Sequence, residues 1–489
     1  MIQHWWCPAI IVLLVFGLIL GLYLYNITGW LKEDDEGTAL YVAWRFAEGE
    51  IPYQELTTTK GPLFLLLGAG LNKLLGPSIL GLRVVTALAV IGGGYVWFRG
   101  LRAAYGLAAG LIGAVAFLLT PEIYRLGRLF RADSWMLALV ACALGLGLIG
   151  YNSKRNRWLV ISGGLLGLAI LTKVIAILPF LGCALFLALR VLLEKPRKES
   201  ALGLVAFVVS CLTVAGLGFS LVEMVTPGAL TMILGSQGAS VRNTPDWGYI
   251  VGRTLVMYGT FIANNLITIL GIPFIRLAIP SRKAVGAGFY FLGQLLTATA
   301  ILIFRGAVYM RYLAYTSLAL SGLLAMGIGH ILNQPRKRSS YAGVATLMLA
   351  GVVLSWFQLR GFLLQSEVGT RALATYIAES TAPDEVILTD YAELAFHAQR
   401  RSVPQTGGIG YGWAAAGLIT GEELIQAIEH YHVSLVALHV PGGPEHPEHL
   451  FHLRDWDTFY RYIQEHFQFE AQMVRAGQLF EIYRRGPDE

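Results

Sequence analysis

Three consecutive acidic residues, Asp34, Asp35 and Glu36, follow the first long apolar run of the sequence. A carboxylate in such a place can take a proton from a substrate hydroxyl or amine, as a general base does. Acids in the first turn of a helix also complement the helix dipole and cap free N–H groups, for a few tenths to about 1 kcal/mol each. A cap needs only one acid, and three neighbours repel one another. From the residues alone, both interpretations stay open.

The elements that must position these acids are predicted to be membrane helices. Hydrophobic residues make up 55% of the 489-residue chain and charged residues 14%, whereas about 25% of a typical globular domain is charged. Apolar runs recur at lengths that suit a hydrocarbon core of roughly 30 Å. The chain is therefore expected to be mostly α, a polytopic transmembrane bundle of about eleven spans, and not an ordinary soluble protein. The spans are predicted at residues 8–27, 82–101, 104–120, 134–151, 158–172, 174–194, 201–222, 254–275, 285–304, 312–332 and 341–359.

The first span is interpreted as a retained anchor helix, because it lacks the basic start and the cleavage site of a signal peptide. A helix over residues 62–76 is rather short to span and is expected to lie in the membrane interface. Short basic loops between alternate spans set the orientation. Placing them all in the cytoplasm puts the N-terminus inside, and the acids and everything after Trp356 outside. These loops contain Arg99 and Arg102, residues 154–157, residues 195–198, Arg282 and Lys283, and residues 336–338.

The same threading leaves several cations on the outer side, where the positive-inside bias should deplete them. Either local structure or an anionic ligand must explain them. A phosphate at the membrane surface would be such a ligand, because arginine offers a planar fork of donors and lysine a point charge. For the arginines of residues 121–134, internal pairing is at least as good an explanation, and Asp133 could simply neutralise Arg131; Lys173 could instead extend its ammonium group to the membrane surface. The outer cations are Lys60, Arg125, Arg128, Arg131, Lys173, Arg305 and Arg311.

Two domains are predicted. Residues 1–360 form the transmembrane domain, in which the first outer loop, 29–81, carries the acids on an amphipathic helix over residues 34–48 at the membrane surface. Residues 361–489 alternate helix and strand, as a small extracytoplasmic α/β domain would, without a glycine-rich phosphate loop. Helices are expected at 367–380, 421–432 and 455–467, and strands at 385–389, 433–440 and 478–484.

A group of histidines in the second domain could in principle hold a metal. His446, His449 and His452 are spaced by three and follow His439 in the sequence. Pro447 and the loop context favour a surface cluster instead, and no closed set of ligands is evident. No metal site and no cofactor are predicted.

The first outer loop resembles the signature of the GT-C glycosyltransferases. It is most similar to their protein O-mannosyltransferase-like and aminoarabinose-transferase-like members from prokaryotes, and the order and spacing match over about fifty residues. The sequence departs from this pattern at Thr59 and Gly61. The residues that carry the resemblance are Asp35-Glu36-Gly37, Tyr41, Ala43, Arg45, Glu48-Gly49, Pro52-Tyr53, Lys60-Gly61-Pro62-Leu63 and Gly76-Pro77-Ser78 through Arg83.

The resemblance implies a role for each candidate residue. The catalytic base would be Asp35, with Glu36 as its neighbour, whereas Asp34 has no counterpart in the pattern. Weaker family features at the later outer ends include Asp133. The expected ligands of the donor phosphate are Lys60, Arg131, Lys173 and Arg311. The candidates for lining the substrate site are Tyr53, Asp133, Tyr309 and Tyr312.

What the resemblance implies about function is sugar transfer at the outer face of the cell membrane. The donor would be a polyprenyl-phosphate-linked sugar, and the acceptor a protein, a glycolipid or a cell-envelope polymer. No nucleic acid and no divalent metal are implied. A transporter or flippase for a lipid-linked or anionic solute is the alternative. Against it, charged residues gather at one face instead of near the centres of the spans, where transporters bind their substrates.

Overall fold

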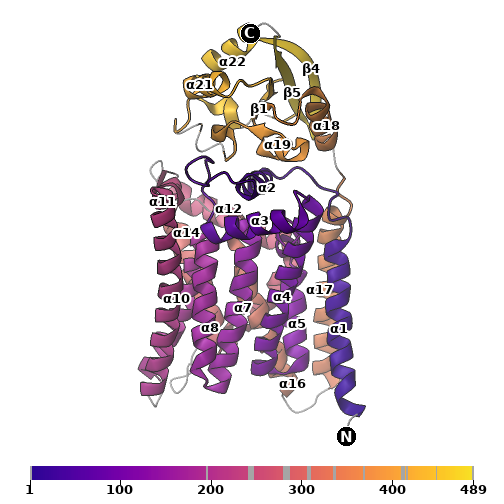
Figure 1. Cartoon of the computed structure of the whole chain (residues 1–489). Coiled ribbons are helices and arrows are strands. Elements are labelled where there is room, and N and C mark those ends of the chain that lie inside the picture. Colours follow the sequence, from indigo (N-terminus) through magenta and orange to yellow (C-terminus); the bar gives the residue numbers. More distant parts are fainter. Residues whose placement is uncertain are drawn as a thin grey trace. The chain divides into compact units, whose positions relative to one another are not determined.

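The computed structural model describes residues 3–193, 197–239, 247–278, 287–305, 310–333, 338–366, 369–408, 414, 417–445, 447 and 449–486. The chain folds into two compact units (Figure 1). The first, here called the helical unit, comprises Met1–Ile27, Arg83–Leu221 and Asn243–Leu364. The second, here called the α/β unit, comprises Thr28–Leu82, Val222–Arg242 and Gln365–Glu489. The first outer loop of the sequence therefore folds with the C-terminal segment.

The helical unit is built from long, largely apolar helices that run alongside one another (Figure 1). Two glycines let α4 and α7 approach to backbone contact: a Cβ on Gly100 would lie 2.5 Å from the carbonyl oxygen of Gly145. Small residues serve membrane bundles in this way, because close backbone approach increases van der Waals contact. Its elements are α1 (Gln3–Leu24), α4 (Ile79–Tyr105), α5 (Leu107–Leu118), α6 (Pro121–Leu126), α7 (Ala132–Ser153), α8 (Asn156–Thr172), η1 (Val174–Ala176), α9 (Ile177–Leu193), α10 (Arg197–Val225), α12 (Trp247–Asn264), η2 (Leu266–Phe274), α13 (Ile275–Ala278), α14 (Ala287–Arg305), α15 (Met310–Leu313), α16 (Thr316–Asn333) and α17 (Arg338–Leu363).

Six helices in the described part of the chain are long and apolar enough to cross a membrane. A seventh span is possible if α12 and the segment after it, bent by 106°, count as one broken span. Four apolar helices are shorter, among them α5 and α8, which occupy two of the expected spans. Twelve residues of helix, as in α5, rise only about 18 Å. The count of about eleven spans is therefore not confirmed, and the described residues supply six candidate spans.

The α/β unit contains one mixed sheet with strand order β2-β1-β3-β5-β4. Strand β1 pairs in parallel with β2 and β3, and β5 pairs antiparallel with β3 and β4. Every residue of β1 and β3 is buried, so these two strands form the centre of the core. The elements of the unit are α2 (Asp34–Ala47), α3 (Pro62–Leu75), α11 (Ala229–Ala239), α18 (Thr370–Ser380), β1 (Val386–Thr389), α19 (Ala392–Ala398), β2 (Arg401–Ser402), η3 (Pro404–Thr406), α21 (Gly421–His430), β3 (Leu435–Val440), η4 (His449–His452), α22 (Trp456–His466), β4 (Phe467–Arg475) and β5 (Gln478–Arg485).

The helices and strands predicted for the C-terminal segment are all present, each within a few residues of its expected bounds. Local signals explain this agreement: at the start of α21, Thr420 and Glu423 form a reciprocal capping box. The sequence did not indicate α19, β2 or β4. Strand β4 exposes most of its residues along one edge of the sheet, so it lacks the apolar alternation that marks a half-buried strand.

Helix α2, which begins at Asp34, packs against α19 of the C-terminal segment (Figure 1). A Cβ at Gly37 would lie only 2.3 Å from the Cβ of Glu393, so the two helices touch at backbone distance. The hydroxyl of Tyr41 both donates to the carbonyl oxygen and accepts from the N–H of Ser402 on β2. Residues 39–44 are all buried, whereas an amphipathic helix leaves one face exposed. The predicted helix is therefore present with the acids in its first turn, but the expectation of an exposed polar face is wrong, because α2 belongs to the core of this unit. Its place at the membrane surface stays a prediction.

Candidate functional site

The acidic stretch lies at the N-terminus of α2, with Glu33 as the N-cap residue and Asp34, Asp35 and Glu36 in the first turn. The side chain of Asp35 is 36% exposed, and its Oδ1 lies 3.2 Å from Nζ of Lys60. The α/β unit thus brings together two predicted site residues that are 25 positions apart in the sequence. An accessible carboxylate paired with an ammonium group is ionised at neutral pH and can accept a proton.

The other two candidates in this unit are more enclosed. Glu36 is buried, with 1% of its surface exposed. Tyr53 is buried, has a positive φ of 70°, and donates its hydroxyl hydrogen to the carbonyl oxygen of Lys60 at 2.6 Å. Burial raises the pKa of Tyr53, so the phenol remains protonated and serves as a donor. Tyr53 therefore holds the backbone of Lys60 in place.

The helical unit gathers the remaining charged candidates around one buried carboxylate. Asp133 lies in the first turn of α7, and its Oδ1 is 2.7 Å from Nζ of Lys173, the residue that ends α8. Arg131, the N-cap of α7, lies 3.8 Å from the other oxygen of this carboxylate. Arg311 on α15 also acts on Asp133 electrostatically. Arginine and lysine are the side chains that most often bind phosphate in proteins, so the cluster offers the donor types that a phosphate needs.

Two other arginines that the threading predicts on the outer side have structural roles, so an anionic ligand is not needed to explain them. Arg125 pairs with Glu122 three residues earlier on α6, at 2.9 Å. Arg128 donates to the carbonyl oxygens of Tyr25 and Asn26, just beyond the C-terminus of α1. A cation at that end complements the helix dipole and the free carbonyl groups. Local structure accounts for these two residues.

Two tyrosine candidates cannot be placed. Tyr309 and the side chain of Tyr312 lie outside the described residues, as does the side chain of Arg305. His446 of the histidine group also lies outside them.

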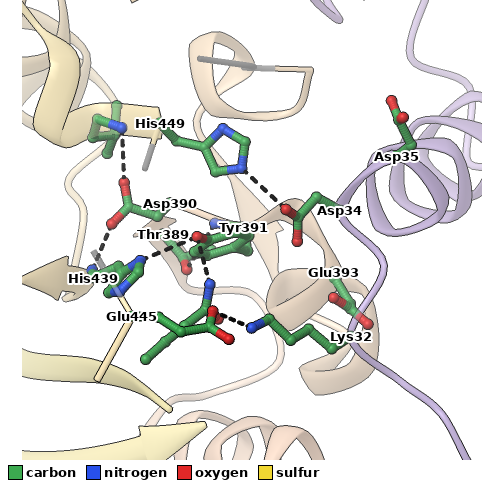
Figure 2. Close-up of polar contacts among 12 residues, drawn as sticks. Lys32, Asp34, Asp35, Thr389, Asp390, Tyr391, Glu393, His439, Glu445 and His449 are labelled. Atoms are coloured by element: carbon green, nitrogen blue, oxygen red, sulfur yellow. Dashed lines mark hydrogen bonds and ion pairs between the residues drawn. The ribbon is translucent and has the colours of Figure 1, made fainter. Parts of the chain in front are cut away.

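A buried polar network that the sequence did not indicate lies in the α/β unit, at the ends of β1 and β3 (Figure 2). The carboxylate of Asp390 accepts the backbone N–H groups of His439 and Leu450. The Tyr391 hydroxyl lies 3.1 Å from Nδ1 of His439 and accepts a hydrogen bond from Gln478. Such a network is invisible in the sequence, because its members come from elements up to 88 positions apart.

His449 joins this network to the acidic stretch. Its ring meets the Tyr391 ring edge-on at 4.7 Å, and its Nε2 lies 3.6 Å from Oδ2 of Asp34 (Figure 2). The prediction of a surface histidine cluster is wrong for His449 and His439, which are 7% and 0% exposed. Spacing alone could not reveal this, because the side chains that contact the two histidines come from distant parts of the sequence: Asp34 and Tyr391 against His449, and Phe480 stacked on His439.

Two members of the network have pKa values displaced in opposite directions. Burial raises the pKa of Asp390 to about 7, although the N–H groups of His439 and Leu450 oppose the shift. Burial also lowers the pKa of His439 to about 4, although Glu445 opposes this shift. Between these values the folded protein holds Asp390 protonated and His439 neutral, whereas the unfolded chain holds the reverse. The folded and the unfolded protein therefore each hold one proton on this pair of residues. As a result, the effects of Asp390 and His439 on the pH dependence of stability oppose each other.

When either group is removed by mutation, the free energy of unfolding should depend on pH with the slope of the group that remains, and the two slopes should have opposite signs. In Asp390→Asn, the stability that neutral His439 contributes is fully present above pH 6.5 and is lost as the pH falls towards 4. In His439→Asn, the contribution of protonated Asp390 is lost as the pH rises from about 4 to 7. We expect changes on the order of 2 kcal/mol in the free energy of unfolding across this window. Thermal unfolding at pH 4.5 and 6.5 measures them, and parallel slopes in the two variants would contradict the assignment.

The chain is similar to known proteins in its sequence pattern and in its structure. Residues 59–215 match the dolichyl-phosphate-mannose-protein mannosyltransferase family, a range that contains Lys60, Arg131, Asp133 and Lys173. No curated protein matches the chain. The structure is similar to ArnT from Cupriavidus metallidurans bound to undecaprenyl phosphate, at 16% identity and a TM-score of 0.65, over 96% of this chain and 97% of that one.

A second solved structure supports the same likeness. The archaeal oligosaccharyltransferase AglB from Archaeoglobus fulgidus, in complex with an inhibitory peptide and a dolichol-phosphate, matches at 14% identity and a TM-score of 0.60. The match covers 100% of this chain and 75% of that one. The chain therefore has the fold of the GT-C glycosyltransferase superfamily, and residues 59–215 carry the sequence pattern of its mannosyltransferase family.

Proposed function

We propose that the chain is an integral-membrane glycosyltransferase that moves a hexosyl or pentosyl group from a polyprenyl-phosphate carrier to an acceptor. The transfer takes place on the extracytoplasmic face, with the N-terminus in the cytoplasm. The observation that carries the proposal is the cluster of Arg131, Lys173 and Arg311 around Asp133, since it suits a phosphate. The ArnT and AglB structures hold undecaprenyl phosphate and a dolichol-phosphate, which supports a donor of this class.

The proposed reaction needs one base and one stabilised leaving group. The acceptor hydroxyl or amine attacks the anomeric carbon, and the bond between that carbon and the phosphate oxygen breaks. The proton of the acceptor passes to Asp35, and the electron pair of the broken bond leaves with the lipid phosphate. Arg131, Lys173, Arg311 and Lys60 stabilise the charge on that phosphate, which is often the largest catalytic contribution.

The direct test is donor consumption by the purified protein in liposomes. Polyprenyl-phosphate-linked mannose, glucose and pentose are each supplied with a Ser/Thr-containing peptide, a glycolipid or an envelope polymer as the acceptor. Turnover of one donor with transfer to one acceptor is expected. Failure to consume any of the donors, together with measurable flux of an anionic or lipid-linked solute, would overturn the proposal in favour of a transporter.

Removal of one cation of the cluster tests its role in donor binding. We expect Lys173→Met to lower kcat/KM for the lipid-linked donor on the order of 10²-fold, because a charge that faces the phosphate is lost. Competition by inorganic phosphate should weaken in parallel. Arg125→Met is the matched control, since Arg125 pairs with Glu122 in the same unit, and its kcat/KM should change little. Equal effects of the two substitutions would show that the cluster has no special role.

A further inference from the structure

Asp34 is the acid for which the family pattern has no counterpart, and its partners lie in the C-terminal segment. Figure 2 shows its carboxylate turned towards His449, whereas the neighbouring Asp35 points away from the network. The Asp34 side chain is 35% exposed, and Oδ2 is the atom that meets His449. The two adjacent acids therefore face different surroundings.

The electrostatics of Asp34 agree with this contact. Burial raises the pKa of Asp34, but His449 and the positive charge of Arg475 outweigh it, so the pKa lies below its ordinary value. The charge of Asp35 works in the opposite direction, which shows that the two carboxylates repel each other. A partner for Asp34 lessens the repulsion that an uncompensated neighbour would exert on Asp35.

The backbone at His449 is held in an uncommon conformation. Its φ is +53°, in the left-handed region that few residues other than glycine adopt. The next residue is fixed because the Leu450 N–H donates to buried Asp390. The ring is fixed by its edge-on contact with Tyr391. Strained residues of this kind persist where the surroundings over-determine them, and they cluster at functional sites.

We propose that His449 is a positioning residue for the proposed glycosyl transfer, acting through Asp34 to hold the first turn of α2 and thereby the carboxylate of Asp35. This inference rests on the proposed function and deepens it. It assigns the C-terminal segment a part in the reaction, because η4 and the Asp390 network fix where α2 begins. It also explains why the stretch contains more acids than the chemistry or a cap needs. Asp34 holds the start of α2 against His449, and Asp35 serves as the base.

The geometry indicates which kinetic constant should respond. A displacement of about 1 Å at the base can cost on the order of 10²-fold in rate without weakening the binding of the donor. His449→Leu keeps the size of the side chain and removes the contact with Asp34, so kcat should fall on the order of 10-fold or more, while KM for the donor changes little. His449→Gln, whose amide nitrogen can reach the position of Nε2, should retain most of the activity.

A double-mutant cycle tests whether His449 acts through Asp34. Once Asp34→Asn is present, adding His449→Leu should change kcat little, because two residues that act through one contact are not additive. The control is His430→Leu, on the exposed surface of α21 in the same unit, which should behave as the wild type does. The inference would be overturned if the effects of Asp34→Asn and His449→Leu on kcat multiplied in the double variant. It would also be overturned if His449→Leu lowered kcat no more than His430→Leu does. A lower melting temperature with unchanged kcat in the folded fraction would also overturn it.

The same variants keep this inference distinct from the proposed function. A wild-type protein that consumes no lipid-linked sugar would overturn the proposed function. In that event the melting temperatures of the four members of the cycle still decide whether Asp34 and His449 are coupled. Additive melting temperatures would overturn the pairing, whatever reaction the protein performs.

Discussion

Asp35→Asn is expected to reduce sugar transfer roughly 10²- to 10⁴-fold, the usual contribution of a general base. The amide has the shape of the carboxylate but cannot take the acceptor proton at neutral pH. The Asp35 side chain is 36% exposed and lies 3.2 Å from Lys60. Because it is partly exposed, the substitution should leave the fold intact. The initial rate of donor consumption measures the effect, and thermal unfolding confirms that the variant is folded.

Glu48→Gln is the matched control for this substitution. It removes one carboxylate from the C-cap of the same helix, where the side chain is exposed, so the transfer rate should stay within about twofold. Asp35→Glu should restore part of the activity, because the longer side chain keeps the base but displaces it. Full transfer activity in a folded Asp35→Asn variant would exclude Asp35 as the base.

The helices and most of the C-terminal elements could be predicted because each is specified by residues close together in the sequence. Apolar runs of span length indicated the helices of the helical unit. Helix periodicity and turn residues indicated most of the C-terminal elements. Asp133 and Lys173 were each singled out as charges at the ends of spans. Their 2.7 Å contact across 40 residues was not predicted.

What the sequence could not show is which distant segments meet. The composition of residues 34–48 suits either a surface helix or one buried by a partner, and the partner, α19, lies more than 340 positions later. The polar core of Asp390, Tyr391 and His439 was missed for a related reason. A buried polar residue has the same local signature as an exposed one until its hydrogen-bond partners are known.

The ion pair between Glu393 and Arg475 predicts the largest change in stability. Arg475 is 0% exposed and Glu393 is 2% exposed, and Nη2 of the arginine contacts Oε2 of the glutamate. The guanidinium also donates to Thr370 at 3.0 Å and lies over the Tyr391 ring at 5.0 Å. Glu393→Gln should destabilise the protein by about 3–5 kcal/mol, because a buried positive charge loses its counter-ion. Thermal or denaturant unfolding of the purified protein measures this.

Replacing both partners separates the cost of an uncompensated charge from the value of the pair itself. Glu393→Gln combined with Arg475→Met buries no charge, so it should be more stable than Glu393→Gln alone. The control is Glu429→Gln, which breaks the pair with Arg485, where the glutamate is 48% exposed; its cost should not exceed about 1 kcal/mol. A Glu393→Gln variant as stable as Glu429→Gln would contradict the prediction. Because α2 rests on α19 at Glu393, the destabilised single variant should also lose transfer activity, since the helix that carries Asp35 loses its support.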